Sequence, residues 1–102
     1  MLTALTRPVS SSITRCELTH LQRVPIDLQT ARQQHAAYEE VLHSLGVNVI
    51  SLPEEAELPD AVFVEDTAIV LDECAILTNP GAASRLPEVD SIAAALTPYR
   101  TL

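Results

Sequence analysis

Three carboxylates lie close together in residues 59–66, Pro-Asp-Ala-Val-Phe-Val-Glu-Asp, and their spacing makes them candidates for binding chemistry. Asp60, Glu65 and Asp66 flank a run of apolar residues whose types favour burial. A carboxylate drawn into an apolar environment is costly unless a cation or hydrogen-bond donors satisfy it. The segment therefore predicts a site for a positively charged group. The structural alternative is that Asp60 begins a turn and that Glu65 and Asp66 form a solvated strand end.

The composition restricts the classes of partner. Of the 102 residues 47% are hydrophobic and only 3% aromatic, which predicts one small domain at most, with an aliphatic core that suits α/β packing. The net charge is -8, from 14 acidic residues against six basic ones, all arginine. This balance disfavours nucleic acid and anionic membranes as partners. It is compatible with a cationic small ligand, although a solvated acidic surface is the commoner explanation of such a balance.

The chain has two cysteines, Cys16 and Cys74, and no CxxC pair. Their number and spacing favour a reducing cytoplasm over a disulfide scaffold, and no metal site is predicted. Cys74 is expected to pack as a small hydrophobic residue and Cys16 to lie in a polar loop, so neither is a candidate nucleophile. No hydrophobic leader or membrane-spanning run is present. We therefore expect a soluble cytoplasmic protein.

The elements that must position these residues begin with a strand at residues 2–9, where apolar and polar side chains alternate. Residues 10–25 show no clean period and predict an ordered loop, with His20 partly exposed in it. Asp27 is a suitable N-cap for a helix that runs to Leu45, and Gly46 is its C-terminal stop. A β-branched run at residues 47–52 then predicts a second strand, parallel to the first through a right-handed crossover.

The predicted helix has one apolar stripe at helical spacing. His35 falls on this stripe, where a hydrogen-bonded core histidine is more common than a catalytic one. The stripe comprises Leu28, Ala31, His35, Tyr38, Val41, Leu42 and Leu45, and the opposite, solvated face comprises Gln29, Gln33, Glu40 and His43.

The second half of the chain predicts a hairpin followed by a helix. Residues 67–71 and 74–78 form its strands, and Asp72-Glu73 its turn. Arg85 stands in the loop after Asn79-Pro80-Gly81, and an amphipathic helix starts near Pro87 and ends before Pro98. Residues 99–102 then begin another strand, so we expect the sequence to be a truncated piece of a longer domain.

Four segments give the chain a specific resemblance to a known family. They are Glu17-Leu18-Thr19-His20-Leu21, Gln34-His35-Ala36-Ala37-Tyr38, Leu58-Pro59-Asp60-Ala61-Val62-Phe63-Val64-Glu65-Asp66-Thr67 and Thr78-Asn79-Pro80-Gly81-Ala82-Ala83-Ser84-Arg85. With these, the chain resembles the dimethylarginine dimethylaminohydrolases of the guanidine-modifying pentein superfamily. The resemblance implies an α/β fold, a five-bladed propeller of ββαβ units, of which residues 1–102 form an incomplete single domain, the N-terminal portion of about two units.

The resemblance also implies a role for each of five residues in binding a methylated arginine. Asp66 lies against the substrate guanidinium with Glu65 beside it, and Asp60 meets the α-amino group. Leu18 offers its backbone carbonyl from a mobile lid, and Arg85 holds the carboxylate. These charges agree with the chemistry, because carboxylates accept hydrogen bonds from a planar guanidinium cation, and the guanidinium of an arginine donates two parallel hydrogen bonds to a carboxylate.

The implied reaction is hydrolysis to citrulline and dimethylamine through a cysteine covalent intermediate, with no metal or organic cofactor. The catalytic Cys, His and Glu would lie beyond Leu102, so the chain alone is expected to be inactive, and the remainder of its propeller is its expected partner. The alternatives are a fragment of an arginine deiminase-like enzyme and a non-catalytic binding or assembly module.

Overall fold

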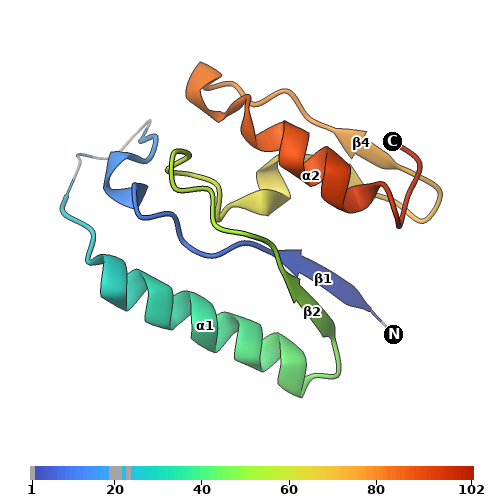
Figure 1. Ribbon diagram of the computed structural model, residues 1–102, viewed down its shortest axis with the longest axis horizontal. Helices are drawn as coiled ribbons and strands as arrows, with labels where there is room; N and C mark the ends of the chain where they lie inside the picture. The colour runs from blue at the N-terminus through green and yellow to red at the C-terminus, as the bar shows by residue number, and fades with distance from the viewer. Residues whose placement is uncertain (1, 19–21, 23) are drawn as a thin grey trace. The chain divides into compact units, whose positions relative to one another are not determined.

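A computed structural model describes residues 2–18, 22 and 24–102 of the chain (Figure 1). The chain divides into two compact units, Met1–Val62 and Phe63–Leu102. Each unit combines β-strands with an α-helix, as expected for an α/β protein. The five-bladed propeller and the incomplete single domain remain predictions.

The first unit is a strand–helix–strand arrangement, and the parallel pairing predicted for it is confirmed. Strands β1 (Thr3–Thr6) and β2 (Asn48–Ser51) pair in parallel. Beyond the ladder, the N–H of Leu52 donates to the carbonyl of Thr6 at 2.7 Å. Helix α1 (Leu28–Ser44) makes the crossover and lies alongside the two strands (Figure 1).

Both ends of α1 lie where the sequence places them. The Asp27 side chain accepts a hydrogen bond from the N–H of Thr30 at 3.2 Å, which satisfies one of the unpaired N–H groups at a helix start. At the other end, Gly46 has a φ of 84°, a left-handed conformation that a Cβ would disfavour. The helix therefore stops because the residue after its C-cap Leu45 can reverse the chain direction.

The apolar stripe of α1 is covered only in part. Leu28, Ala31 and Leu42 are half-buried, but Tyr38, Val41 and Leu45 are exposed, so the stripe was predicted too wide. The predicted solvated face is confirmed, since Gln29, Gln33, Glu40 and His43 are all exposed. The physical reason is that, among the described residues, strand β2 and the buried core around Ile13 cover only a narrow band of the helix.

His35, predicted to be hydrogen-bonded, is half-buried on α1. Its Nε2 lies 3.4 Å from Oε1 of Glu39, one turn further on, but forms no hydrogen bond with the described residues. Oε2 of Glu39 accepts a hydrogen bond from the Thr6 hydroxyl at 2.7 Å. Glu39 therefore links the helix to β1.

The hydrophobic core of the first unit lies next to the loop that follows β1. Val9, Ile13 and Cys16 are buried there, and Ile26, Leu28, Ala31 and Val62 pack against them. The expectation for Cys16 was a polar loop, and it is wrong. A 3₁₀ turn over Ile13–Arg15 ends with the N–H of Cys16 bonded to the carbonyl of Ile13 at 3.0 Å, which directs the thiol side chain inward. His20, also predicted for this loop, lies outside the described residues.

The second unit consists of the predicted hairpin and helix. Strands β3 (Ala68–Val70) and β4 (Ala75–Leu77) pair antiparallel. Helix α2 (Glu88–Leu96) contacts β4 and buries Ile92 and Leu96. Near the end of the chain, Thr101 forms a single parallel bridge with Cys74, which is consistent with the extended conformation predicted there.

The segment at residues 61–66 is not the strand that its composition suggested. It runs through a turn into a 3₁₀ helix, η2 (Val64–Asp66). Ala61 is buried as expected, but Phe63 is 40% exposed. Strand formers here do not form a ladder because their backbone groups bond locally, the N–H of Asp66 to the carbonyl of Phe63 at 3.1 Å and that of Thr67 to Val64 at 3.1 Å.

No helix among the described residues is both long enough and apolar enough to cross a membrane.

Candidate functional site

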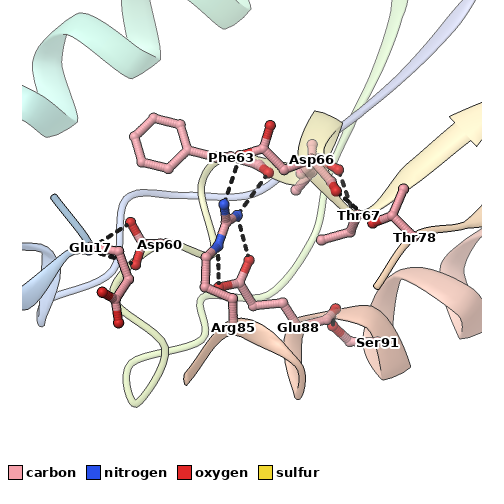
Figure 2. Close-up of polar contacts among 10 residues, drawn as sticks. Glu17, Asp60, Phe63, Asp66, Thr67, Thr78, Arg85, Glu88 and Ser91 are labelled. Atoms are coloured by element: carbon pink, nitrogen blue, oxygen red, sulfur yellow. Dashed lines mark hydrogen bonds and ion pairs between the residues drawn. The ribbon is translucent and has the colours of Figure 1, made fainter. Parts of the chain in front are cut away.

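The polar centre of the second unit is the guanidinium of Arg85, which is bound by two carboxylates (Figure 2). Glu88 takes one edge of it, accepting from Nε at 3.0 Å and from Nη2 at 2.8 Å. Asp66 accepts from Nη1 at 2.7 Å, and the carbonyl of Phe63 accepts from Nη2 at 3.3 Å. A guanidinium held at several of its N–H groups has a fixed plane, which suits it to recognise a planar anion.

Local structure explains how Arg85 and Glu88 meet. Arg85 ends the 3₁₀ turn η3 (Ala83–Arg85), and Glu88 is the first residue of α2. Pro87, with φ of -62°, is pre-set for the entry into that helix. The two side chains are thus three residues apart on continuous helical turns, where side chains are neighbours.

Asp66 is positioned by its neighbour Thr67 and by the hairpin. Thr67 is fully buried and its hydroxyl donates to the carbonyl of Val64 at 2.7 Å. The hydroxyl of Thr78 donates to the carbonyl of Asp66 at 2.6 Å, and the N–H of Thr78 to the carbonyl of Thr67 at 3.0 Å. The hairpin end therefore fixes the backbone from which the Asp66 carboxylate projects.

The two carboxylates on Arg85 differ in their exposure to solvent. The Glu88 side chain is 4% exposed and the Asp66 side chain 51%. The hydrogen bond to Glu88 is the largest cause that raises the pKa of Arg85 above its ordinary value; burial opposes this shift, and Asp66 adds to it. Arg85 therefore stays charged throughout the neutral range. With one cation and two anions, the cluster has a formal charge of -1.

Glu65 is exposed beside this cluster in sequence. Its carboxylate forms no hydrogen bond or ion pair with the residues that the structure describes. It lies in η2, one residue before Asp66.

Asp60 belongs to the first unit and is buried there. Its carboxylate accepts from the N–H of Glu17, at 3.1 Å to Oδ2 and 3.3 Å to Oδ1 (Figure 2). This bond anchors the chain one residue before Leu18, whose side chain is 38% exposed. The expectation that a buried carboxylate needs hydrogen-bond donors is confirmed for Asp60.

Two residues that the family resemblance assigned to opposite ends of a substrate contact each other in the structure. Asp66, expected at the guanidinium, and Arg85, expected at the carboxylate, bind each other directly. Glu88 was missed as a candidate altogether. A signal was present: an acid in the first turn of a helix, three residues after the arginine, is at the spacing of an ion pair.

No family model matches the chain. The curated dimethylarginine dimethylaminohydrolase of Pseudomonas aeruginosa is 38% identical over 85 residues, which are 83% of this chain and 33% of that protein. The protein of the same name from Streptomyces coelicolor is 35% identical over 89 residues, 87% of this chain and 34% of the relative. The chain thus spans about a third of the length of the curated relatives it matches.

Comparison with solved structures also finds dimethylarginine dimethylaminohydrolases. A mutant of the Pseudomonas aeruginosa enzyme complexed with citrulline matches with a TM-score of 0.89 at 33% identity, over 96% of this chain and 38% of that one. A mutant dimethylarginine dimethylaminohydrolase, solved as an adduct with S-methyl-L-thiocitrulline, matches with a TM-score of 0.87 at 32% identity, over 96% of this chain and 38% of that one. The chain therefore has the α/β fold of this class of hydrolases over its length. It is a homologue of the dimethylarginine dimethylaminohydrolases, and the resemblance read from the four segments is confirmed.

Proposed function

We propose that this chain is the N-terminal, substrate-binding part of an amidine hydrolase that converts Nω-methylated arginines to citrulline and methylamine or dimethylamine. One observation carries the proposal: the chain matches a relative that was solved with citrulline, with a TM-score of 0.89 at 33% identity. Citrulline is what remains when water replaces the methylated nitrogen of such a guanidine. The acidic groups described above are of the type that binds the cationic groups of a methylated arginine, and Arg85 is of the type that binds its carboxylate.

Four of the five proposed binding residues are charged, and each has the charge opposite to that of its part of the ligand. Asp66 and Glu65 bind the guanidinium, and Asp60 binds the α-amino group. Leu18 contributes its backbone carbonyl from a lid, and Arg85 binds the carboxylate.

The covalent chemistry is proposed to come from residues outside this chain. A cysteine thiolate attacks the guanidinium carbon, a histidine protonates the leaving nitrogen, and the bond to the amine breaks. Water then attacks the covalent intermediate, forms citrulline and restores the thiolate. Within this chain, Cys16 is packed into the apolar core of the first unit.

Citrulline release by the longer protein that carries this chain tests the proposal. With asymmetric dimethylarginine we expect equal amounts of citrulline and dimethylamine. Turnover of arginine with release of ammonia, and none of the methylated substrate, would identify a deiminase instead. No turnover of either, with calorimetric binding retained, would identify a binding module.

A further inference from the structure

Glu88 is a buried acid, and among the described residues its carboxylate binds one partner, Arg85. It is 4% exposed as a side chain, and its two oxygens accept from the Nε and Nη2 of Arg85. A charge so far from water is retained only where a counter-charge and hydrogen bonds compensate it. Glu88 and Arg85 supply both for each other, so neither is expected to leave the pair readily.

A role for Glu88 in capping α2 does not explain this geometry. No side-chain cap is present at that helix start, and the Glu88 carboxylate points to Arg85, as Figure 2 shows. If Glu88 served only to place a negative charge near the positive end of the helix, it could do so from an exposed position, as Asp90 in the same turn does.

The two edges of the Arg85 guanidinium are therefore used differently. The Nε–Nη2 edge faces buried Glu88, while the Nη1 side faces Asp66, which is half in water. Ion pairs with exposed partners are weakened by solvent screening, so the contact with Asp66 is the exchangeable one. A ligand carboxylate could replace Asp66 on Arg85 without breaking the fork to Glu88.

We propose that Glu88 is a positioning residue: it holds the Nε–Nη2 edge of Arg85 so that the Nη1 side binds the ligand carboxylate in exchange for Asp66. The inference rests on the proposed function, in which Arg85 binds the carboxylate and Asp66 the guanidinium. The exchange also explains how two residues in contact can serve two ends of one ligand. When the ligand carboxylate binds Arg85, it displaces the Asp66 carboxylate, which is then available to bind the ligand guanidinium.

The test compares two substrates in the longer protein, dimethylarginine and its analogue that lacks the α-carboxylate. Glu88→Gln keeps the shape of the side chain but removes its charge and one acceptor. We expect KM for dimethylarginine to rise about tenfold or more, as for a lost charge-assisted interaction, with kcat and the constants for the decarboxylated analogue changed less than about twofold. Asp90→Asn, in the same helical turn but exposed, is the matched control and should leave both substrates unchanged.

A wild-type protein that turns over neither substrate overturns the proposed function and the inference with it. An active wild type in which Glu88→Gln is silent, or affects both substrates equally, overturns the inference alone. If Glu88→Gln does not fold, nitrogen-15 NMR of the wild type decides. The Nε–H resonance of Arg85 should persist when dimethylarginine saturates the protein, and its loss overturns the role of Glu88.

Discussion

At the residue scale, the behaviour of Asp66 depends on what lies opposite its carboxylate. The Asp66 side chain is half-exposed and forms an ion pair with Arg85, and both features are compatible with a surface ion pair as well as with a ligand-binding acid. In the first case neutralising it changes little, because exposed ion pairs contribute only about 0–1 kcal/mol. In the second, the charge is needed when the substrate cation arrives.

We expect Asp66→Asn in the longer protein to lower kcat/KM for dimethylarginine roughly thirty-fold or more, the effect of about 2 kcal/mol or more for removing one partner of a desolvated charge pair. The thermal midpoint should hardly move. Steady-state kinetics with circular dichroism as a folding check measure both. Asp72→Asn, an exposed acid in the hairpin turn, is the control, and near-normal kinetics of a folded Asp66→Asn would remove this residue from the site.

Thr67 tests the support beneath Asp66. Its hydroxyl is fully buried and donates to the carbonyl of Val64 at 2.7 Å. Thr67→Val keeps the volume but removes the hydroxyl that donates to that carbonyl, and because the N–H of Thr67 still donates to it at 3.1 Å, we expect a cost of about 1 kcal/mol. Thr67→Ser keeps the donor and loses a methyl group. Denaturant unfolding should therefore rank Val below Ser in stability, and the reverse order would mean that packing, not the hydrogen bond, is what Thr67 contributes.

At the element scale, α1 depends on its N-terminal cap. Asp27→Ala removes the acceptor for the N–H of Thr30 and should lower the free energy of unfolding by about 1 kcal/mol. Asp27→Ser restores a capping oxygen and should recover most of this loss. Chemical denaturation of both variants checks the pair, and equal stabilities would show that the cap contributes nothing.

The loop after β2 is held by a buried arginine at the end of β1. Arg7, which is buried, donates to the carbonyl of Pro53 and lies 3.4 Å from Oε1 of Glu55. The Ser10 hydroxyl adds a bond to the carbonyl of Ala56 at 3.1 Å. These contacts join the loop to the segment before Asp60, which itself binds the N–H of Glu17.

We expect Arg7→Met, which keeps an apolar stem, to lose about 1–3 kcal/mol of stability, because the Pro53 carbonyl and the Glu55 carboxylate lose their contact with the buried guanidinium. The amide of Glu17 should also exchange faster with solvent, since the loop that carries Asp60 is released. Hydrogen exchange by NMR measures this. Arg32→Met removes the exposed ion pair to Glu54 and is the control, with little expected effect. Unchanged exchange at Glu17 in Arg7→Met would show that Arg7 does not position Asp60.

At the scale of the whole molecule, both units leave apolar side chains exposed. Leu2, Tyr38, Val41 and Leu45 are exposed in the first unit, and Ile69, Val70 and Ile76 in the second. In the described part of each unit the sheet has two strands, and the bridge between Cys74 and Thr101 is the single further pairing at their edges. Small sheets with open edges and apolar patches are marginal in water.

The chain expressed alone is therefore expected to bind a hydrophobic dye, to self-associate, and to unfold without a sharp transition. It should release no citrulline from dimethylarginine, because binding groups alone provide no covalent route. Size-exclusion chromatography, dye fluorescence and a citrulline assay measure these properties. A monodisperse monomer with a cooperative transition, or turnover that depends on Cys16 or Cys74, would contradict this expectation.

Local signals in the sequence were enough to predict most of the helices and strands and the resemblance to a family. Asp27, Gly46 and the β-branched run at residues 47–52 are local signals, so α1 and the strands beside it were predicted within a few residues. The order of motifs gave the resemblance that the comparisons confirm. Capping, glycine conformation and β-propensity act over a few residues, which is why sequence is sufficient for them.

The side-chain contacts, by contrast, depend on the folded arrangement of the chain. Strand-forming residues 61–64 gave a turn and a 3₁₀ helix, because the bonds available to their backbone were local ones. Cys16 turned inward with the 3₁₀ turn before it, and the apolar stripe of α1 was left half uncovered by two short strands. Asp66 and Arg85 pair across 19 residues, and Glu88 holds Arg85 from its other edge. Such contacts depend on how the hairpin end and the start of α2 are placed, and that placement is set by packing over the whole unit.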